Sequence, residues 1–197
     1  MTGLFPGVPL PSSLPLEDSD TWLTPPWILD LVRLVGGDDG GIALDPCPGP
    51  FGWTGAKCEI RLDRGQDGLE VDWKGVLDHS GNEGLVYVNP PYGPGHLALW
   101  SQKILREAEK GCEVIALLPA TPGPEWFQSF APKADAVLFL SGRPKFHDPR
   151  TLLEPDGPGM KDSALFYFGT WPGLFVRTFR EKGWAVMSDP RGRAEHR

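Results

Sequence analysis

The sequence predicts one α/β domain, with a mixed, mostly parallel sheet flanked by helices. From Leu85 onward short apolar runs alternate with segments of helical periodicity, which is the pattern of consecutive βαβ units. The chain of 197 residues is long enough for one domain with its own core and short for two. Its 25 Gly and 22 Pro residues predict many loops, so loops should form much of the functional surface.

Three segments are expected along the chain. Residues 1–19 are rich in Pro, Gly and Ser without a sustained period, and are expected to form a flexible arm. The folded domain is expected over residues 20–188. A basic C-terminal tail, residues 189–197, is expected to follow it.

The domain is expected to begin with a helix. Thr24 is predicted to be its N-cap, because Pro25 and Pro26 fit the first turn and apolar residues follow at helical spacing. Gly36 and Gly37 should end it. Strands are expected at residues 42–44, 59–62, 69–71, 85–88, 113–118, 136–140, 164–168 and 184–187, and further helices at 96–110, 125–130 and 172–182.

Composition argues against several classes of protein. The net charge of −7 is not that of a protein that coats nucleic acid, so any DNA contact must come from local patches. Three cysteines without paired spacing and four scattered histidines predict neither a disulfide framework nor a metal site. No apolar run reaches the ~18 residues of a membrane span, and no signal-peptide pattern is present, so a cytoplasmic protein is expected.

The main candidate for chemistry is Asn89-Pro90-Pro91-Tyr92, which directly follows the apolar run Val86–Val88. Open α/β sheets bind ligands at the carboxyl ends of their strands. The Asn89 side-chain oxygen and the Pro90 carbonyl, held by two fixed φ angles, offer acceptors for both N–H groups of a planar amine such as adenine N6. Such acceptors stabilise positive charge on that nitrogen during methylation. Tyr92 offers a ring on which an extruded base can stack. An ordinary turn at a strand exit is the alternative interpretation.

This tetrapeptide is one of several ordered motifs. They are Asp20-Thr21-Trp22-Leu23-Thr24-Pro25, Leu44-Asp45-Pro46-Cys47, Asp72-Trp73, Asn89-Pro90-Pro91-Tyr92-Gly93, Leu117-Leu118-Pro119-Ala120, Gly142-Arg143-Pro144-Lys145-Phe146 and Ser163-Ala164-Leu165. From Asp20 to about Val186 the chain resembles the phage-encoded, Dam-type DNA N6-adenine methyltransferases. The resemblance implies a Rossmann-like methyltransferase fold, S-adenosylmethionine as methyl donor, double-stranded DNA as substrate, and the cytoplasm of a bacterial or phage-infected cell.

The resemblance also implies a cofactor site. The Asp45 carboxylate is suited to accept from the cofactor's ammonium or ribose, and capping the turn before Pro46 is its alternative role. The loop after Asp45 departs from the usual glycine fingerprint. Asp67 and Asp72 are candidates for contacts with the ribose or the adenine of the cofactor. A solvated loop carboxylate explains each of them equally well. Carried over to this chain, the cofactor-binding residues are Trp22, Thr24, Pro25, Asp45, Pro46, Asp67, Asp72 and Asn89.

The substrate is expected to meet Tyr92 and the predicted loop 141–162. Phe146 is predicted to cover the second face of the flipped base, with core packing as the alternative. Phosphate contacts are expected from basic residues of this loop, for which a solvated surface is the alternative. These basic residues are Arg143, Lys145, Arg150 and Lys161.

The predicted reaction is site-specific methyl transfer to adenine N6 in DNA, with base flipping. Its catalytic residues are expected to be Asn89, Pro90, Pro91 and Tyr92. Two alternatives stay open: the same chemistry on a protein glutamine or on guanine N2 of RNA, and a non-catalytic DNA-binding protein with this fold.

Overall fold

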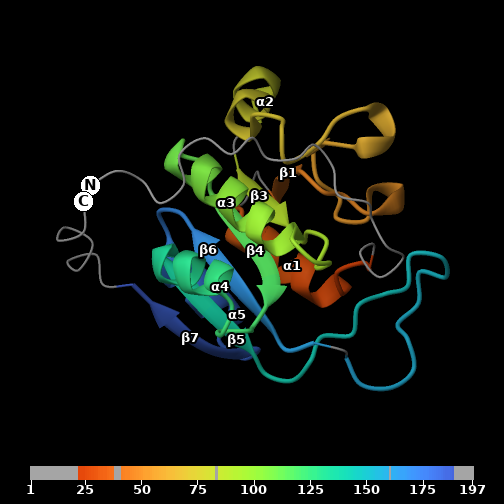
Figure 1. Cartoon of the computed structure of the whole chain (residues 1–197), viewed down its shortest axis with the longest axis vertical. Helices are drawn as coiled ribbons and strands as arrows, with labels where there is room; N and C mark the ends of the chain where they lie inside the picture. The colour runs from red at the N-terminus through yellow and green to blue at the C-terminus, as the bar shows by residue number, and fades with distance from the viewer. Residues whose placement is uncertain (1–21, 38–40, 83, 160, 189–197) are drawn as a thin grey trace.

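The computed structural model describes residues 22–37, 41–82, 84–159 and 161–188. The arm predicted at residues 1–19 and the tail predicted at 189–197 lie outside these ranges. The described residues form an α/β structure in which one seven-stranded sheet lies between two layers of helices (Figure 1). The predicted fold class is therefore confirmed.

The sheet has the strand order β2-β1-β3-β4-β6-β5-β7. Strands β1 to β4 pair in parallel, whereas β6 pairs antiparallel with both β4 and β5, and β7 pairs antiparallel with β5. Strands β1 to β5 thus run in one direction, and β6 and β7 run in the other. The strands are β1 (Ile42–Asp45), β2 (Cys58–Glu59), β3 (Leu85–Val88), β4 (Val114–Pro119), β5 (Ala136–Leu140), β6 (Ser163–Phe168) and β7 (Gly183–Met187).

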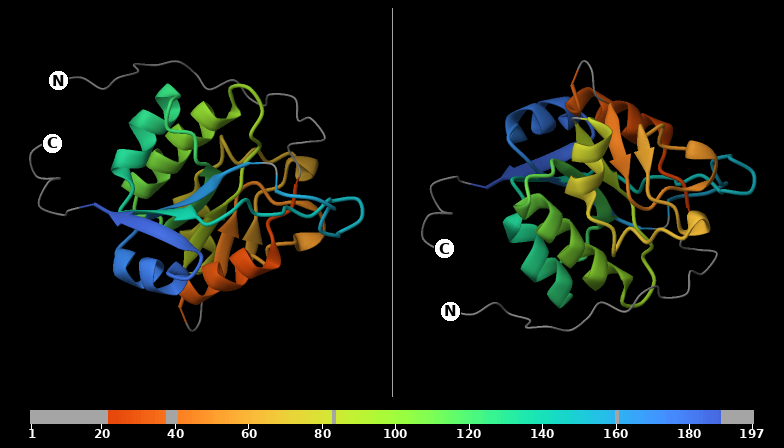
Figure 2. Two further views of the ribbon diagram at one scale, coloured as in Figure 1. Left: turned by 90° about the horizontal axis from the view of Figure 1, so that it is seen from below. Right: turned by 90° about the horizontal axis from the view of Figure 1, so that it is seen from above.

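The helices cover both faces of the sheet (Figure 2). Helices α1 and α5 pack on one face, and α2, α3 and α4 pack on the other. The helices are α1 (Pro26–Val35), α2 (Trp73–Ser80), α3 (His96–Glu109), α4 (Glu125–Phe130) and α5 (Pro172–Phe179), with short 3-10 turns η2 (Pro50–Gly52), η3 (Leu62–Arg64) and η4 (Ala131–Lys133).

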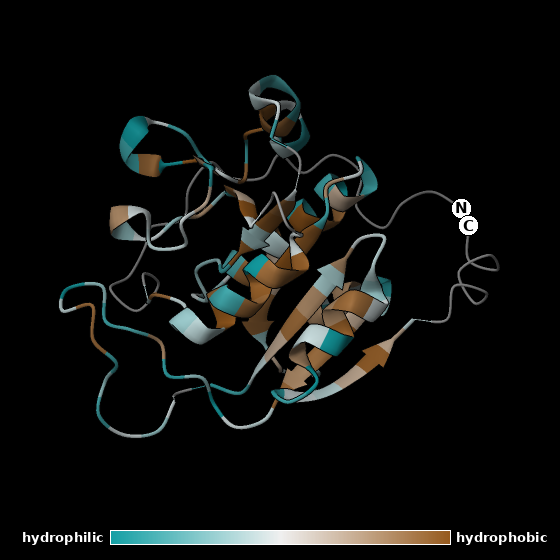
Figure 3. Cartoon of the chain, turned by 180° about the vertical axis from the view of Figure 1, so that it is seen from behind, coloured by the Kyte–Doolittle hydropathy of each residue, from teal (hydrophilic) through white to brown (hydrophobic). Residues whose placement is uncertain are grey.

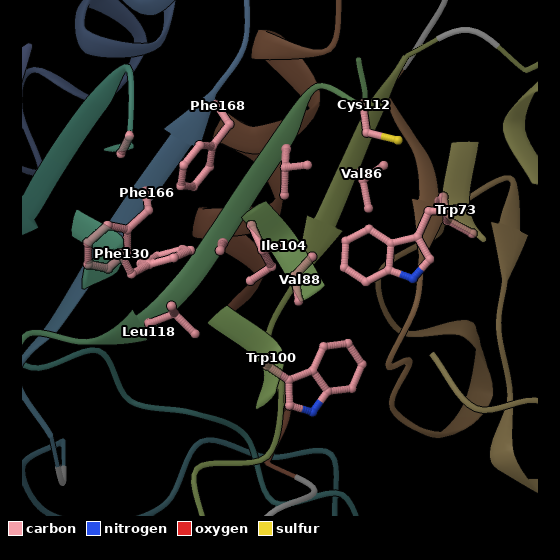
Figure 4. Packing of buried hydrophobic residues seen from close by; sticks show 14 of the residues in the cluster. Trp73, Val86, Val88, Trp100, Ile104, Cys112, Leu118, Phe130, Phe166 and Phe168 are labelled. Atoms are coloured by element: carbon pink, nitrogen blue, oxygen red, sulfur yellow. The ribbon is translucent and has the colours of Figure 1, made fainter. Parts of the chain in front are cut away.

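The two faces of the sheet have separate apolar cores because the central strands are buried on both sides. Strands β3 and β4 are buried along their whole length, as expected for parallel strands between helical layers. Hydrophobic residues accordingly fill the strands, and polar residues lie in loops and on outer helix faces (Figure 3). On the α2–α4 face, Trp73 and Trp100 flank Val88, and Phe130 and Phe166 fill the other end (Figure 4).

Several sequence-based expectations about these elements were wrong in detail. Helix α1 begins at Pro26 with Pro25 before it, and Thr24 does not cap it. The Thr24 hydroxyl instead hydrogen-bonds the Tyr87 hydroxyl at 2.8 Å, because Thr24 is buried against β3. No strand is formed at residues 69–71, where Asp67 closes a turn by accepting the Leu69 N–H at 2.9 Å.

Further differences are an additional helix, a shifted strand and the order of strands in the sheet. Residues 73–80 form helix α2, which the sequence analysis did not predict, and β2 lies at Cys58–Glu59 rather than at residues 59–62. Strands β4 and β5 are parallel, as expected for a βαβ unit, but β6 is inserted between them. Strand order depends on contacts between distant segments, and local periodicity carries no information about it.

Candidate active site

A cavity of about 300 Å³ lies at the carboxyl ends of β1 and β3. The chain leaves both strands here through irregular loops, and the turns η2 and η3 form part of the surrounding wall (orange and gold in Figure 1). Its lining residues are Trp22, Leu23, Thr24, Asp45, Pro46, Cys47, Pro48, Gly49, Pro50, Trp53, Thr54, Ile60, Arg61, Leu62, Asp63, Asp67, Gly68, Leu69, Asn89, Pro91, His96 and Trp100.

Most of the predicted cofactor residues meet at this cavity. Trp22, Thr24, Asp45, Pro46, Asp67 and Asn89 all line it. Pro25 is buried but is not among the lining residues. Asp72 also lies outside, on the surface at the start of α2, where its carboxylate pairs with Lys110 at 2.9 Å. The hydrogen bond from Lys110 lowers the pKa of Asp72. In this structure Asp72 is therefore part of a surface ion pair and not of the cavity.

Asp45 is the buried carboxylate of the cavity. Its Oδ1 accepts the Cys47 N–H at 3.0 Å, which closes the turn around Pro46, and its Oδ2 accepts the Thr54 hydroxyl at 2.9 Å. Burial raises the pKa of Asp45 from 3.8 to about 7, and these hydrogen bonds only partly oppose that rise. Capping of the turn is therefore observed, while the same side chain also faces the cavity.

Asn89 is held in a defined orientation at the end of β3. The Tyr92 hydroxyl lies 2.9 Å from Asn89 Oδ1 and 2.8 Å from the Leu117 carbonyl oxygen, so it can donate to either acceptor. The Asn89 amide nitrogen donates to the Trp22 carbonyl at 3.3 Å. Burial raises the pKa of Tyr92, so this hydroxyl stays a donor at neutral pH. Asn89 Oδ1 keeps acceptor capacity for a ligand, because a carbonyl oxygen has two lone pairs.

The two aromatic residues predicted to contact the base lie together. The ring centroids of Tyr92 and Phe146 are 6.4 Å apart, with the rings almost perpendicular at 89°. Lys161 places its ammonium 5.6 Å from the centroid of the Tyr92 ring. Phe146 and Tyr92 therefore do not form two parallel faces in this structure, and a base stacked on Tyr92 would meet Phe146 in another orientation.

Residues 22–24 connect the cavity to the loop 141–162. The main chains of Leu23 and His147 form a two-way bridge, with N–H to O distances of 3.0 and 2.9 Å. The Trp53 indole donates to the Thr24 carbonyl at 2.7 Å. Together with the bond from Asn89 to Trp22, these contacts join the predicted substrate loop, the cavity wall and the predicted catalytic motif.

Three of the four basic residues of the loop 141–162 are paired with acidic residues of the same loop. Arg143 contacts Asp162 at 3.0 Å, Lys145 contacts Glu154 at 2.9 Å and Arg150 contacts Asp148 at 2.8 Å. Arg143 and Lys145 are partly exposed, at 50% and 39%, and Arg150 is 79% exposed, although its partner Asp148 is only 17% exposed. Exposed ion pairs are worth only about 0–1 kcal/mol, so phosphate groups can replace these carboxylates at small cost.

Much of the cavity wall consists of residues that were not predicted from the sequence. Trp53, Thr54, Arg61, His96 and Trp100 line it, and they come from loops, short turns and the first turns of α3. The segment between β1 and β3 has no sustained periodicity, so its residues could not be assigned to the site in advance. Trp is a rare residue, and this was the one sequence feature that drew attention to Trp53 and Trp100. It does not show whether a Trp lies in the apolar core or in the wall of a cavity.

A buried ion pair on α3 supports the segment that carries Asp67. The Lys103 ammonium donates to Glu107 Oε1 and to the Val71 carbonyl, both at 2.7 Å. The side chains of Lys103 and Glu107 are only 6% and 1% exposed. Glu107 Oε2 also accepts the Lys74 N–H at 3.2 Å, so the pair ties the start of α2 to α3.

Replacing Glu107 by Ala is expected to lower the free energy of unfolding by about 3–5 kcal/mol, because it leaves the Lys103 ammonium buried without its carboxylate. Urea denaturation followed by circular dichroism measures this loss. The double variant Lys103→Met/Glu107→Leu removes both charges, so its free energy of unfolding should fall much less. A Glu107→Ala loss below about 1 kcal/mol would contradict a desolvated pair.

The described residues contain neither a metal-ligand cluster nor a membrane-spanning helix. Among the described residues, no three or more His, Cys, Asp or Glu side chains are grouped as they would be to hold a metal ion. Within the same residues, no helix combines the length and the apolar character that crossing a membrane requires.

Comparison with known proteins identifies the family. The sequence model of the family described as DNA N-6-adenine-methyltransferase (Dam) matches residues 11–179, which is most of the chain. No curated protein matches the chain. The matched range includes the cavity, the motif that begins at Asn89 and the loop 141–162. The chain belongs to the family of DNA N-6-adenine-methyltransferases.

Proposed function

We propose that this protein transfers a methyl group from S-adenosylmethionine to the N6 amine of adenine in DNA. The observation that carries the proposal is the position of Asn89. It lies at the carboxyl end of β3, lines the cavity, and is held by hydrogen bonds to the Tyr92 hydroxyl and the Trp22 carbonyl. A fixed amide oxygen beside a cofactor-sized cavity is what methylation of a planar amine requires.

The cavity suits S-adenosylmethionine in size and chemistry. Small-molecule sites usually measure about 300–1,000 Å³ and combine apolar walls with a few polar groups. Trp53 and Trp100 provide aromatic surface, while Asp45 and Asp67 provide carboxylates for an ammonium or for ribose hydroxyls.

In this proposal the residues of the chain orient the adenine N6 amine, and none of them removes a proton from it. S-adenosylmethionine supplies an electrophilic methyl group with a good leaving group. Asn89 Oδ1 and the Pro90 carbonyl accept the two N–H bonds of adenine N6 and hold them out of the ring plane, which localises the lone pair on nitrogen. As N6 bonds to the methyl carbon, the carbon–sulfur bond breaks toward sulfur, and N6 then loses one proton to solvent. No strong base is needed, which fits a neutral Asn at this position.

Base flipping follows from the recessed position of this site. A stacked adenine inside a duplex cannot reach a side chain that lines a cavity, so the target base has to leave the helix. Tyr92 provides the ring for stacking, and its hydroxyl orients Asn89 at the same time. One residue thus supports both the bound base and the catalytic acceptor.

The test is transfer of labelled methyl from S-adenosylmethionine to unmethylated double-stranded DNA, to RNA and to protein, each assayed separately. We expect label in DNA and background levels in RNA and protein. Label in protein or RNA with none in DNA would overturn the choice of acceptor. Label in none of the three, from a protein that binds DNA, would favour the non-catalytic alternative.

A further inference from the structure

Two exposed leucines form the tip of the loop 141–162. Leu152 and Leu153 are 40% and 68% exposed, although the rest of this loop is largely polar. In Figure 3 a hydrophobic stretch interrupts the hydrophilic loop, and Figure 1 shows that this loop extends beyond the sheet on the side of the cavity. Because the two leucines are adjacent, they form an apolar spot on this loop, and such a spot is a candidate for contact with a partner.

The tip is ordered by its own hydrogen bonds. The Asp148 N–H donates to the Leu153 carbonyl at 3.0 Å, and the Leu152 N–H donates to the Asp148 carbonyl at 2.7 Å. Asp148 also accepts the Arg150 N–H at 2.8 Å. Leu152 has a φ of 61°, a backbone conformation that leucine seldom adopts. The turn therefore presents the two side chains outward at a conformational cost that a plain connecting loop would not need.

The tip is linked to the residues expected to receive the base. Glu154, which follows Leu153, forms an ion pair with Lys145 at 2.9 Å, and Lys145 precedes Phe146. Phe146 in turn contacts the ring of Tyr92 edge to face. The leucine tip is thus one ion pair away from the aromatic pair at the catalytic motif.

We propose that Leu152 and Leu153 form a wedge that enters the DNA base stack and occupies the space left by the flipped adenine. This inference rests on the proposed function. Apolar side chains that insert between base steps are a known way to unstack a duplex, and a wedge must lie next to the pocket that takes the extruded base. Leu153 is the more exposed of the two and is assigned the inserting role, with Leu152 beside it.

The surroundings of the tip favour DNA as the partner of these leucines. The loop 141–162 contains four basic and four acidic residues, so its net charge is zero in a chain of net charge −7. The loop can therefore approach phosphates with less repulsion than the rest of the protein. The ion pair of Arg143 with Asp162 is exposed on both sides, which leaves Arg143 able to exchange a carboxylate for a phosphate, and Arg150 is itself 79% exposed.

The test compares two duplexes that differ only opposite the target. The first is a duplex whose methylated adenine has been mapped with the wild-type protein, and the second has an abasic site opposite that adenine, which makes extrusion easier. For Leu153→Ala we expect kcat/KM on the intact duplex to fall about tenfold or more, and on the abasic duplex to change less than about threefold. Leu152→Asn, which tolerates a positive φ, should show the same selective loss.

Leu34→Ala is the matched control, because Leu34 is a leucine of α1 with 65% exposure. It should methylate both duplexes as the wild type does. Equal losses on the two duplexes, or no loss on either, would overturn the wedge, and the second result would leave a protein partner as the explanation of the tip. No methylation of DNA by the wild type would overturn the proposed function and the wedge with it.

Discussion

Replacing Asn89 by Ala is expected to lower kcat for methyl transfer by about a hundredfold or more. The change removes the acceptor that holds one N–H of the amine, and removal of one preorganised transition-state contact typically costs 10²–10³ in rate, or about 3–4 kcal/mol. The fold should survive, because Asn89 is half-buried and lies in a loop after β3. Single-turnover methylation of DNA at saturating S-adenosylmethionine measures the effect.

Two variants separate the role of Asn89 from general damage. Asn82→Ala changes the other asparagine of the chain, whose amide contacts Cys58 Sγ, and it should keep wild-type activity. Tyr92→Phe keeps the ring but removes the hydroxyl that hydrogen-bonds Asn89 and the Leu117 carbonyl, so we expect a smaller fall in kcat. Wild-type kcat in Asn89→Ala would contradict the assignment of this side chain as the acceptor.

Cofactor affinity is expected to depend on pH through Asp45. The pKa of this carboxyl is raised to about 7 by burial, so below pH 7 it is mostly protonated and cannot pair with a cation. We expect the Kd for S-adenosylmethionine to weaken by about tenfold for each pH unit below 7 and to level off above it, as mass action requires for one titrating group. Calorimetric titration of the whole chain between pH 5.5 and 8.5 measures this.

Asp45→Asn gives the control for that dependence. The variant keeps an oxygen for the Cys47 N–H and should fold, but it loses the charge. Its Kd at pH 8 should be about 10–100 times weaker than that of the wild type, in line with about 1.5–3 kcal/mol for a hydrogen bond to a charged group. The pH dependence should disappear in the variant. A wild-type Kd that is constant from pH 6 to 8 would show that Asp45 does not contact the cofactor through its charge.

The same carboxyl affects the stability of the free protein. Because its pKa is higher in the folded state than the ordinary 3.8, the folded protein holds this proton more tightly than the unfolded chain does. The contribution of Asp45 to the free energy of unfolding is therefore complete below about pH 4 and is lost as pH rises to about 7. A bound cofactor cation would favour the ionised form and reverse that loss.

The sequence was most informative where an element is buried on both sides. Strands β3 and β4 are continuous apolar runs because helices cover both of their faces, and the motif at Asn89 could be placed at a strand end for that reason. Asp45 was predicted as a cofactor residue for the same reason, because a polar residue at the end of a buried strand is conspicuous. The structure brings Asp45 and Asn89 to the same cavity.

Other features depend on contacts between distant segments. Helix α2 is only two turns long and is fixed by Trp73, by Leu77 and by the bond from Lys74 to Glu107, none of which is visible in local periodicity. The placement of β6 between β4 and β5 depends on pairing across more than 40 residues of chain. The edge-to-face contact of Phe146 with Tyr92 likewise depends on how the loop 141–162 folds back.

The central claim is tested most directly by identifying the modified nucleoside. Unmethylated double-stranded DNA would be incubated with the protein and S-adenosylmethionine, digested to nucleosides and analysed by mass spectrometry, with Asn89→Ala treated in parallel. We predict that the wild type forms N6-methyladenine and that Asn89→Ala forms about a hundredfold less of it. N4-methylcytosine in place of N6-methyladenine, or equal N6-methyladenine from both proteins, would contradict the account.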